Sequence, residues 1–214
     1  QPGALERQHR RGRGGGEAQG EDGGARGVVV EAPVEEGARG TFWEDGRGDE
    51  RRRMVERQIA SRGVEDGATL AAMRAVPRHE LVPERYAGAA YDDRPLPIGH
   101  GQTISQPYIV GFMTELLDLE AGDTVLEVGT GSAYQAAVLG QIVDHVVTIE
   151  IIDELAQTAA ADLKAMGYTN ITVLNGDGYF GYEPQAPYDA IIVTAAAEHI
   201  PPPLIDQLKP GARM

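Results

Sequence analysis

The chain has 214 residues, of which 42% are hydrophobic, which is enough for one domain of ordinary size with a buried core. Its formal net charge of −14 argues against nucleic acid or anionic lipid as a partner, because both attract basic surfaces. The chain also lacks an apolar run long enough to span a membrane. Cysteine is absent, which excludes a disulfide framework, a thiolate nucleophile and a cysteine-based zinc site, and fits a reducing compartment.

Residues 1–50 differ from the rest of the chain. They are rich in glycine, arginine and glutamate, as in RRGRGGG, and lack apolar periodicity, so we predict a flexible low-complexity tail. Within it, VVVEAPV (28–34) could form a short strand. The chain begins with Gln1 and not with Met, so we expect a fragment. We expect a cytoplasmic location, with an exported form as the alternative.

Residues 51–214 are predicted to form one domain, whose first portion, 51–122, is helical. Met54, Val55 and Ile59 recur at helical spacing. Asp66 is placed to cap a second helix, ATLAAMRAV, which should end before Pro77.

An irregular loop is predicted next, because proline and glycine are frequent in RPLPIGHG. A helix should follow, with Ser105 at its N-cap and Pro107 in its first turn. Its apolar face is expected to comprise Ile109, Val110, Met113, Leu116 and Leu117.

From residue 123 onward, strands and helices alternate, which predicts an α/β fold with a parallel sheet and helices on both faces. The expected strands are 124–128, 145–151, 171–175 and 188–196, and the expected helices are 133–142, 153–167 and 202–208. KPG should end the last helix, and GARM should start a fifth strand beside the fourth.

The first strand of this portion leads into a glycine turn, VLEVGTGSAYQ. Gly129 and Gly131 fit the dinucleotide fingerprint, but Tyr134 stands where its third glycine is required, and no Lys-Ser/Thr follows to make a Walker loop. The strand ends instead carry Glu127, Glu150 and Asp177. Carboxylates there can bind ribose hydroxyls and a cationic group, which favours a nucleoside with a positive tail, such as S-adenosylmethionine, over an anionic pyrophosphate.

Residues 51–214 contain the stretches VPRHELVP, GQTISQP, VLEVGTGSAYQAAVL and NGDGYFGYEPQAPYDAIIVTAAA. These stretches resemble the protein-L-isoaspartate O-methyltransferases, and GQTISQP is the most specific of them. The resemblance implies a class I (Rossmann-like) S-adenosylmethionine-dependent methyltransferase fold, truncated here after the fourth to fifth strand. It also implies methyl transfer to the free α-carboxylate of L-isoaspartyl residues, a step in the repair of damaged proteins.

The resemblance assigns roles residue by residue. Glu127, Gly129 and Gly131 would line the methionine end of the cofactor, Glu150 would hold the ribose, and Asp177 with Gly178 the adenine side. Ser105 matches the family's catalytic-site serine, Thr103 and Ile104 would line the same pocket, and His100 and Gln102 are candidates for substrate binding. We expect no metal, no nucleic acid and no membrane partner, and a monomer acting on isoaspartyl-containing proteins.

Two departures from the family pattern stand out. Ala133 replaces the last glycine of the usual GTGSGY loop, and the family chain continues past GARM. Three alternatives remain at this level: another class I methyltransferase that acts on a small molecule or nucleic acid, a nucleotide-binding dehydrogenase, and an S-adenosylmethionine-binding module without activity.

Overall fold

The structure is a computed structural model, and it describes residues 46–195 and 199–214. The predicted tail, including the strand suggested at 28–34, lies outside the described residues up to position 45. The first helix begins at Gly48, slightly before the domain boundary predicted at residue 51.

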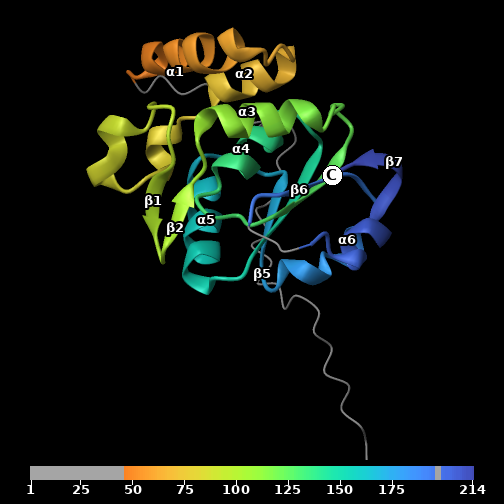
Figure 1. Cartoon of the computed structure of the whole chain (residues 1–214). Helices are drawn as coiled ribbons and strands as arrows, with labels where there is room; N and C mark the ends of the chain where they lie inside the picture. Colours follow the sequence, from red (N-terminus) through yellow and green to blue (C-terminus); the bar gives the residue numbers. More distant parts are fainter. Residues whose placement is uncertain (1–45, 196–198) are drawn as a thin grey trace, which may run out of the picture.

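From residue 107 onward, helices and strands alternate, and helices and helical turns predominate before them (Figure 1). The α-helices are α1 (Gly48–Met54), α2 (Gly67–Ala75), α3 (Pro107–Leu116), α4 (Tyr134–Gly140), α5 (Asp153–Ala165) and α6 (Pro202–Asp206). The strands are β1 (Leu96–Gly99), β2 (Gln102–Ile104), β3 (Thr124–Val128), β4 (His145–Glu150), β5 (Ile171–Asn175), β6 (Tyr188–Val193) and β7 (Leu208–Arg213). Short helical turns are η1 (Val55–Ile59), η2 (Ala60–Arg62), η3 (Arg78–Leu81), η4 (Glu84–Ala89), η5 (Gly178–Phe180) and η6 (Glu183–Gln185).

The predicted parallel sheet is confirmed. Its strands lie in the order β5-β4-β3-β6-β7, and each neighbouring pair is parallel. Strands β3 and β5 have the predicted bounds, and each is followed directly by a glycine, Gly129 or Gly176. Strand β7 lies beside β6 as expected but begins at Leu208, so the KPG predicted to end the last helix is part of this strand.

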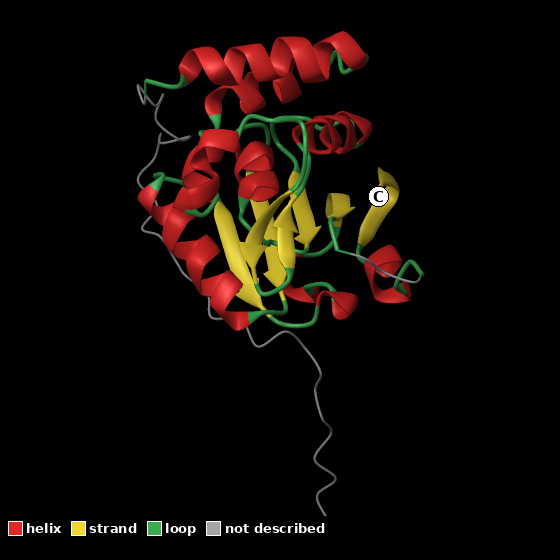
Figure 2. Cartoon of the chain, turned by 60° about the vertical axis from the view of Figure 1, so that its left-hand side comes forward, coloured by secondary structure: helices red, strands yellow, loops and turns green. Residues whose placement is uncertain are grey.

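Figure 2 shows the sheet with helices around it. Two clusters of buried apolar residues include residues of the sheet, which explains the continuous apolar strands. Alternate residues of β3 face opposite layers: Val125 packs with α4 and α5, whereas Leu126 packs with Leu204 of α6. Both strand residues are fully buried. Burial on both faces is what makes a parallel strand apolar at successive positions.

The predicted apolar face of α3 is partly wrong. Ile109 and Leu116 are 38% and 51% exposed, while the helix buries Val110, Gly111 and Thr114. The reason is close packing, since a Cβ added at Gly111 would lie 2.9 Å from side-chain atoms of Ile59 and Met73. Small residues therefore form the tight face, and some larger ones point outward.

Two local predictions before α3 are also wrong. The predicted RPLPIGHG loop contains strand β1, which pairs with β2 just after it in a two-stranded antiparallel hairpin. The N-cap of α3 is Gln106 and not Ser105. The free amide of Tyr108 in the first turn donates instead to the Asp93 carboxylate at 3.0 Å. Asp93 and not Ser105 therefore accepts the hydrogen bond in the first turn of this helix.

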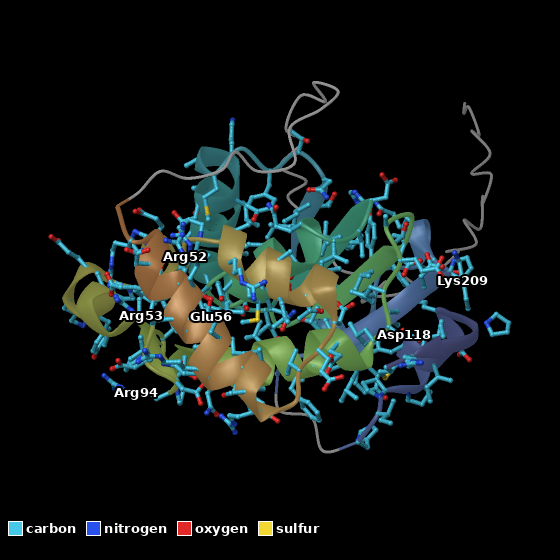
Figure 3. All side chains as sticks on the ribbon, turned by 90° about the horizontal axis from the view of Figure 1, so that it is seen from above. Arg52, Arg53, Glu56, Arg94, Asp118 and Lys209 are labelled. Atoms are coloured by element: carbon cyan, nitrogen blue, oxygen red, sulfur yellow. The ribbon has the colours of Figure 1, made fainter. Side chains whose placement is uncertain are left out.

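Charged side chains cover the outside of the molecule, and several pair with each other. Figure 3 shows Arg52, Arg53 and Glu56 along the first helical turns. Near the end of β7, Arg213 pairs with Asp118 at 2.6 Å and donates to the Leu116 carbonyl at 3.0 Å. Exposed pairs of this kind contribute little to stability. Within residues 46–195 and 199–214, no helix is both long enough and apolar enough to cross a membrane.

Candidate cofactor and substrate site

A cavity of about 630 Å³ opens at the carboxyl ends of β3, β4 and β5. This edge is where open parallel sheets bind their ligands. The sequence-predicted residues that line the cavity are Gln102, Thr103, Ile104, Ser105, Glu127, Gly129, Gly131, Glu150, Asp177 and Gly178. His100 lies in the turn between β1 and β2 and is not among the lining residues, so its role stays a prediction.

Glu127 is the most deeply buried carboxyl group of the cavity, with no exposed surface. It pairs in register with Thr148 of β4, and the Thr148 hydroxyl donates to Glu127 Oε2 at 2.6 Å. The Thr130 hydroxyl lies 2.6 Å from that of Thr148, so the two hydroxyls form a short chain beneath the carboxyl group. In the described part of the chain, Glu127 Oε1 has no hydrogen-bond partner.

Burial raises the pKa of Glu127 to about 8, and the charge of Glu150 acts in the same direction, while the Thr148 hydrogen bond opposes them. A buried carboxyl with an unpaired oxygen is costly unless a ligand supplies a partner. The arrangement therefore fits a ligand that brings a positive charge to Glu127.

Glu150 is held in place by the backbone. One of its carboxylate oxygens accepts from Gly131 N at 2.8 Å, and the other accepts from Ile152 N at 3.0 Å. Each carboxylate oxygen has further acceptor capacity, since a carboxylate can accept about four hydrogen bonds. The side chain can therefore brace the glycine loop and still accept from two vicinal hydroxyls of a ligand.

The glycine loop is fixed on the opposite side by Thr194, after β6. The Thr194 hydroxyl donates to the Gly129 carbonyl at 2.6 Å, and a Cβ at Gly129 would lie only 2.7 Å from that hydroxyl. Gly129 also has φ +102°, a conformation that L side chains rarely adopt. Glycine is thus required at this position for two separate reasons.

Ala133, the departure from the family loop, also lies in the left-handed region, with φ 67°. Its side chain is fully buried, and its amide donates to the Thr130 carbonyl at 2.8 Å. The backbone turn is preserved with alanine, although this conformation favours glycine.

The third strand end is shaped by close packing and by a turn. A Cβ at Gly178 would lie 2.4 Å from a methyl group of Val128. The Asp177 side chain accepts from Tyr179 N at 2.9 Å, so it serves the turn as well as lining the cavity.

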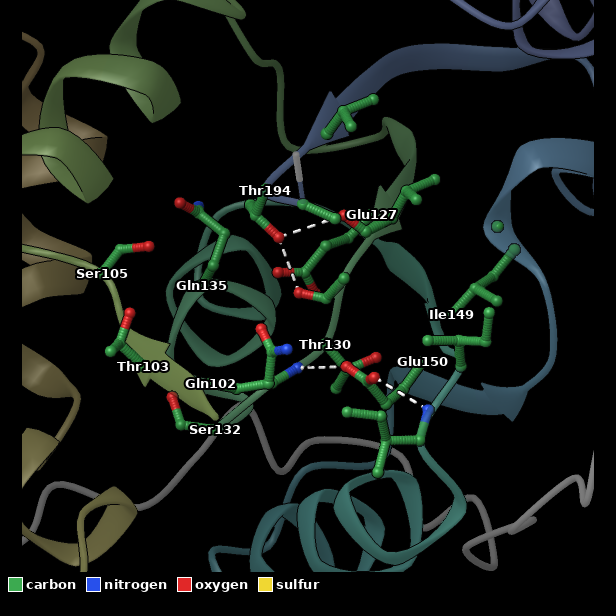
Figure 4. A pocket seen from close by; sticks show the side chains of 18 of the residues that line it. Gln102, Thr103, Ser105, Glu127, Thr130, Ser132, Gln135, Ile149, Glu150 and Thr194 are labelled. Carbon is green, nitrogen blue, oxygen red and sulfur yellow. Dashed lines mark hydrogen bonds between the residues drawn. The ribbon is translucent and has the colours of Figure 1, made fainter. Parts of the chain in front are cut away.

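The wall formed by Thr103 and Ser105 lies across the cavity from Ile149 and Glu150 (Figure 4). Ser105 is half-buried and Thr103 is exposed, so both hydroxyls are open to a molecule entering from solvent. The same cavity therefore has an acidic end, formed by Glu127 and Glu150, and a hydroxyl wall, formed by Thr103 and Ser105.

Sequence reasoning missed several polar residues of this site, among them Thr130, Gln135, Thr148 and Thr194. Gln135 lines the cavity and donates to the Thr114 hydroxyl at 2.8 Å, and Thr148 supports Glu127 from the neighbouring strand. The alignment of β3 with β4 would have found Thr148, because it places this residue opposite Glu127. His199 also lines the cavity.

Comparison with known proteins identifies the family. The family profile of protein-L-isoaspartate(D-aspartate) O-methyltransferase matches residues 49–214. The chain is similar to a protein-L-isoaspartate O-methyltransferase of Opitutus terrae, with 57% identity over 80% of this chain and 74% of that protein. It is also similar to one of Methanoculleus marisnigri, with 56% identity over 77% of this chain and 75% of that protein.

Solved structures agree. A protein-L-isoaspartate O-methyltransferase structure aligns with a TM-score of 0.68 and 30% identity, over 75% of this chain and 53% of that one. For the fold alone, a Plasmodium falciparum structure described as a putative member, in complex with S-adenosyl-L-homocysteine, aligns with a TM-score of 0.63 and 24% identity over 74% of this chain. The chain has the class I S-adenosylmethionine-dependent methyltransferase fold and belongs to the protein-L-isoaspartate O-methyltransferase family.

Proposed function

We propose that the cavity at the strand ends binds S-adenosylmethionine and carries out the reaction of this enzyme family, methyl transfer to the α-carboxylate of L-isoaspartyl residues. One observation carries the proposal: Glu127 and Ser105 line the same cavity. The acidic end suits a cationic methyl donor, and the hydroxyl wall suits an anionic methyl acceptor.

The chain's residues fit the cofactor. Glu127 would take the cationic methionine end, since its Oε1 is buried and lacks a partner among the described residues. Glu150 would take the ribose hydroxyls, and Asp177 and Gly178 would line the adenine side. When bound, S-adenosylmethionine supplies a methyl group that its sulfonium already activates.

The acceptor needs no general base. A carboxylic acid with a pKa of about 4 is ionised at neutral pH, so its oxygen is nucleophilic without losing a proton to the protein. The contribution of Ser105 is a hydrogen bond from its hydroxyl, which orients the carboxylate toward the donor side of the cavity. Thr103 offers a second hydroxyl on the same wall. Holding the carboxylate and the methyl donor in the correct orientation can by itself accelerate the methyl transfer.

The decisive experiment supplies labelled S-adenosylmethionine with paired peptides that differ only in one residue, L-isoaspartate or L-aspartate. We expect methyl transfer to the isoaspartyl peptide alone. Transfer to both peptides alike, or to neither, contradicts the proposal.

The partners and location are part of the same proposal. We propose that the protein acts as a monomer, on isoaspartyl-containing proteins and not on nucleic acid, in the cytoplasm. The net charge of −14 disfavours nucleic acid, and the lack of cysteine fits a reducing compartment. Sedimentation of the purified protein tests the monomer, and methyl transfer to RNA or DNA would contradict the choice of substrate.

A further inference from the structure

Arg78 is buried beside the segment that carries Ser105 in the hydroxyl wall of the cavity. Arg78, in η3, has no exposed surface, and in the described part of the chain it forms no ion pair with a carboxylate. Burial lowers its pKa to about 10, so it remains cationic at neutral pH. A charge is expensive to bury without a carboxylate partner, so the groups that this arginine contacts explain its position.

The Arg78 guanidinium contacts three segments that are distant in sequence. Its Nε donates to the Ala90 carbonyl at 2.8 Å, and its Nη2 donates to the Ser105 carbonyl at 2.7 Å. Its Cζ also lies 4.7 Å from the ring centre of Tyr134, the first residue of α4. The segment that carries the site serine is thereby tied to the helix that follows the glycine loop.

The backbone that follows Ser105 is fixed from the other side by Asp93. One oxygen of Asp93 accepts from Tyr108 N at 3.0 Å, and the other accepts from the Gln106 side chain at 2.8 Å. Arg78 is therefore the group that fixes the Ser105 carbonyl itself. The orientation of this peptide group decides where the adjoining side chain points.

We propose that Arg78 is a positioning residue for methyl transfer, which fixes the Ser105 peptide so that its hydroxyl meets the substrate carboxylate. This inference rests on the proposed function. Arg78 acts through Ser105, since it is not among the residues that line the cavity. Its planar guanidinium can bond two carbonyl groups at once and lie over an aromatic ring, which a lysine ammonium cannot reproduce.

The test compares Arg78→Met and Arg78→Lys with the control Arg51→Met, all in the full chain. Arg51 is also buried, and it donates to the Arg74 carbonyl at 3.0 Å and to the Tyr91 hydroxyl at 3.3 Å, away from the cavity. We expect Arg78→Met to lower kcat per folded molecule by about tenfold or more, because a displacement of about 1 Å can lower a rate by about 100-fold. Affinity for S-adenosyl-L-homocysteine should be unchanged, and Arg78→Lys should recover part of kcat. Arg51→Met should lower stability and leave kcat per folded molecule unchanged.

Hydrogen exchange supplies a readout that does not depend on activity. Arg78→Met should lose amide protection in residues 103–108, while protection in β3 stays at the wild-type level; Arg51→Met should retain protection in residues 103–108. Wild-type kcat in Arg78→Met, equal losses in Arg78→Met and Arg51→Met, or failure of both Arg78 variants to fold would each overturn the inference. Failure of the wild-type protein to methylate the isoaspartyl peptide would instead refute the proposed function.

Discussion

Glu127→Gln tests the charge of the cavity directly. Glu127 is fully buried, is hydrogen-bonded through Oε2 to Thr148, and has a pKa of about 8 in the ligand-free protein. Glutamine preserves the shape and one acceptor oxygen but cannot ionise. The substitution therefore removes the ionisation of this side chain while keeping its volume.

The magnitude follows from the raised pKa. At pH 7 a carboxyl group with a pKa of about 8 holds about nine-tenths of a proton, and this proton must leave if a bound cation requires the carboxylate. We expect binding to release about 0.9 proton from Glu127 at pH 7, close to one at pH 6 and close to none above pH 9. The apparent affinity should fall about tenfold, or about 1.4 kcal/mol, for each pH unit below 8.

The same shift affects the ligand-free protein. Because the pKa of Glu127 is higher in the folded state than its ordinary value of 4.5, its contribution to stability is complete below pH 4.5 and is lost as the pH rises through 8. Glu127→Gln should remove this decline, which urea titrations at several pH values would measure.

The binding assay is calorimetric titration with S-adenosyl-L-homocysteine, which cannot donate a methyl group. Titrations at pH 6, 7 and 9, each in two buffers with different ionisation enthalpies, give the number of protons released. The ligand's own amine can also exchange protons on binding, so the difference between wild type and Glu127→Gln isolates the protein group. Equal proton release by the two proteins at pH 6 and 7 would refute the assignment of Glu127 to the cationic end.

Four further substitutions test the rest of the site. Glu150→Ala should weaken S-adenosyl-L-homocysteine binding by about 1.5–3 kcal/mol, the range for hydrogen bonds to charged groups, as measured by calorimetry. Ser105→Ala should lower kcat while the urea midpoint stays unchanged, because Ser105 is not the helix cap; a loss of stability with full turnover would contradict this. Gly178→Ala should destabilise the protein by about 1–3 kcal/mol through the clash with Val128, and adding Val128→Ala should recover part of the loss. Ala133→Gly should raise the free energy of unfolding by about 1 kcal/mol, since glycine suits the left-handed conformation.

The sequence predicts the sheet well because each strand is a short, mostly apolar segment that can be recognised without knowledge of its neighbours in space. An acidic residue lies at or near the carboxyl end of three strands: Glu127 in β3, Glu150 at the end of β4, and Asp177 two residues after β5. Parallel strands bring these ends to one edge without any further information. The positions of the three carboxyl groups in one cavity were therefore predictable.

The segment before α3 was less predictable, because its structure depends on distant partners. Its helix cap comes from Asp93, fifteen residues before Tyr108. The prediction of the buried face of α3 is partly wrong because Gly111 lets the helix lie close to Ile59 and Met73. The spacing of large apolar residues in the sequence does not indicate such close packing. The hairpin β1–β2 was hidden by Pro97 and Gly99, which read as loop residues.

Register explains why two glutamates at neighbouring strand ends differ in their chemistry. Glu127 lies one residue before the end of β3 and pairs with Thr148, so its carboxyl group is buried and accepts a hydrogen bond from a hydroxyl. Glu150 is the last residue of β4, where the chain turns, so the loop amides of Gly131 and Ile152 reach its carboxylate. Among residues 46–195 and 199–214, the first group therefore has a buried oxygen without a partner, which a cation would satisfy, and the second is braced to accept hydroxyls. A pyrophosphate would bring negative charge against both groups, whereas a nucleoside with a cationic tail presents a suitable partner to each. The choice of ligand class therefore follows from a register offset between two strands and not from the glycine turn alone.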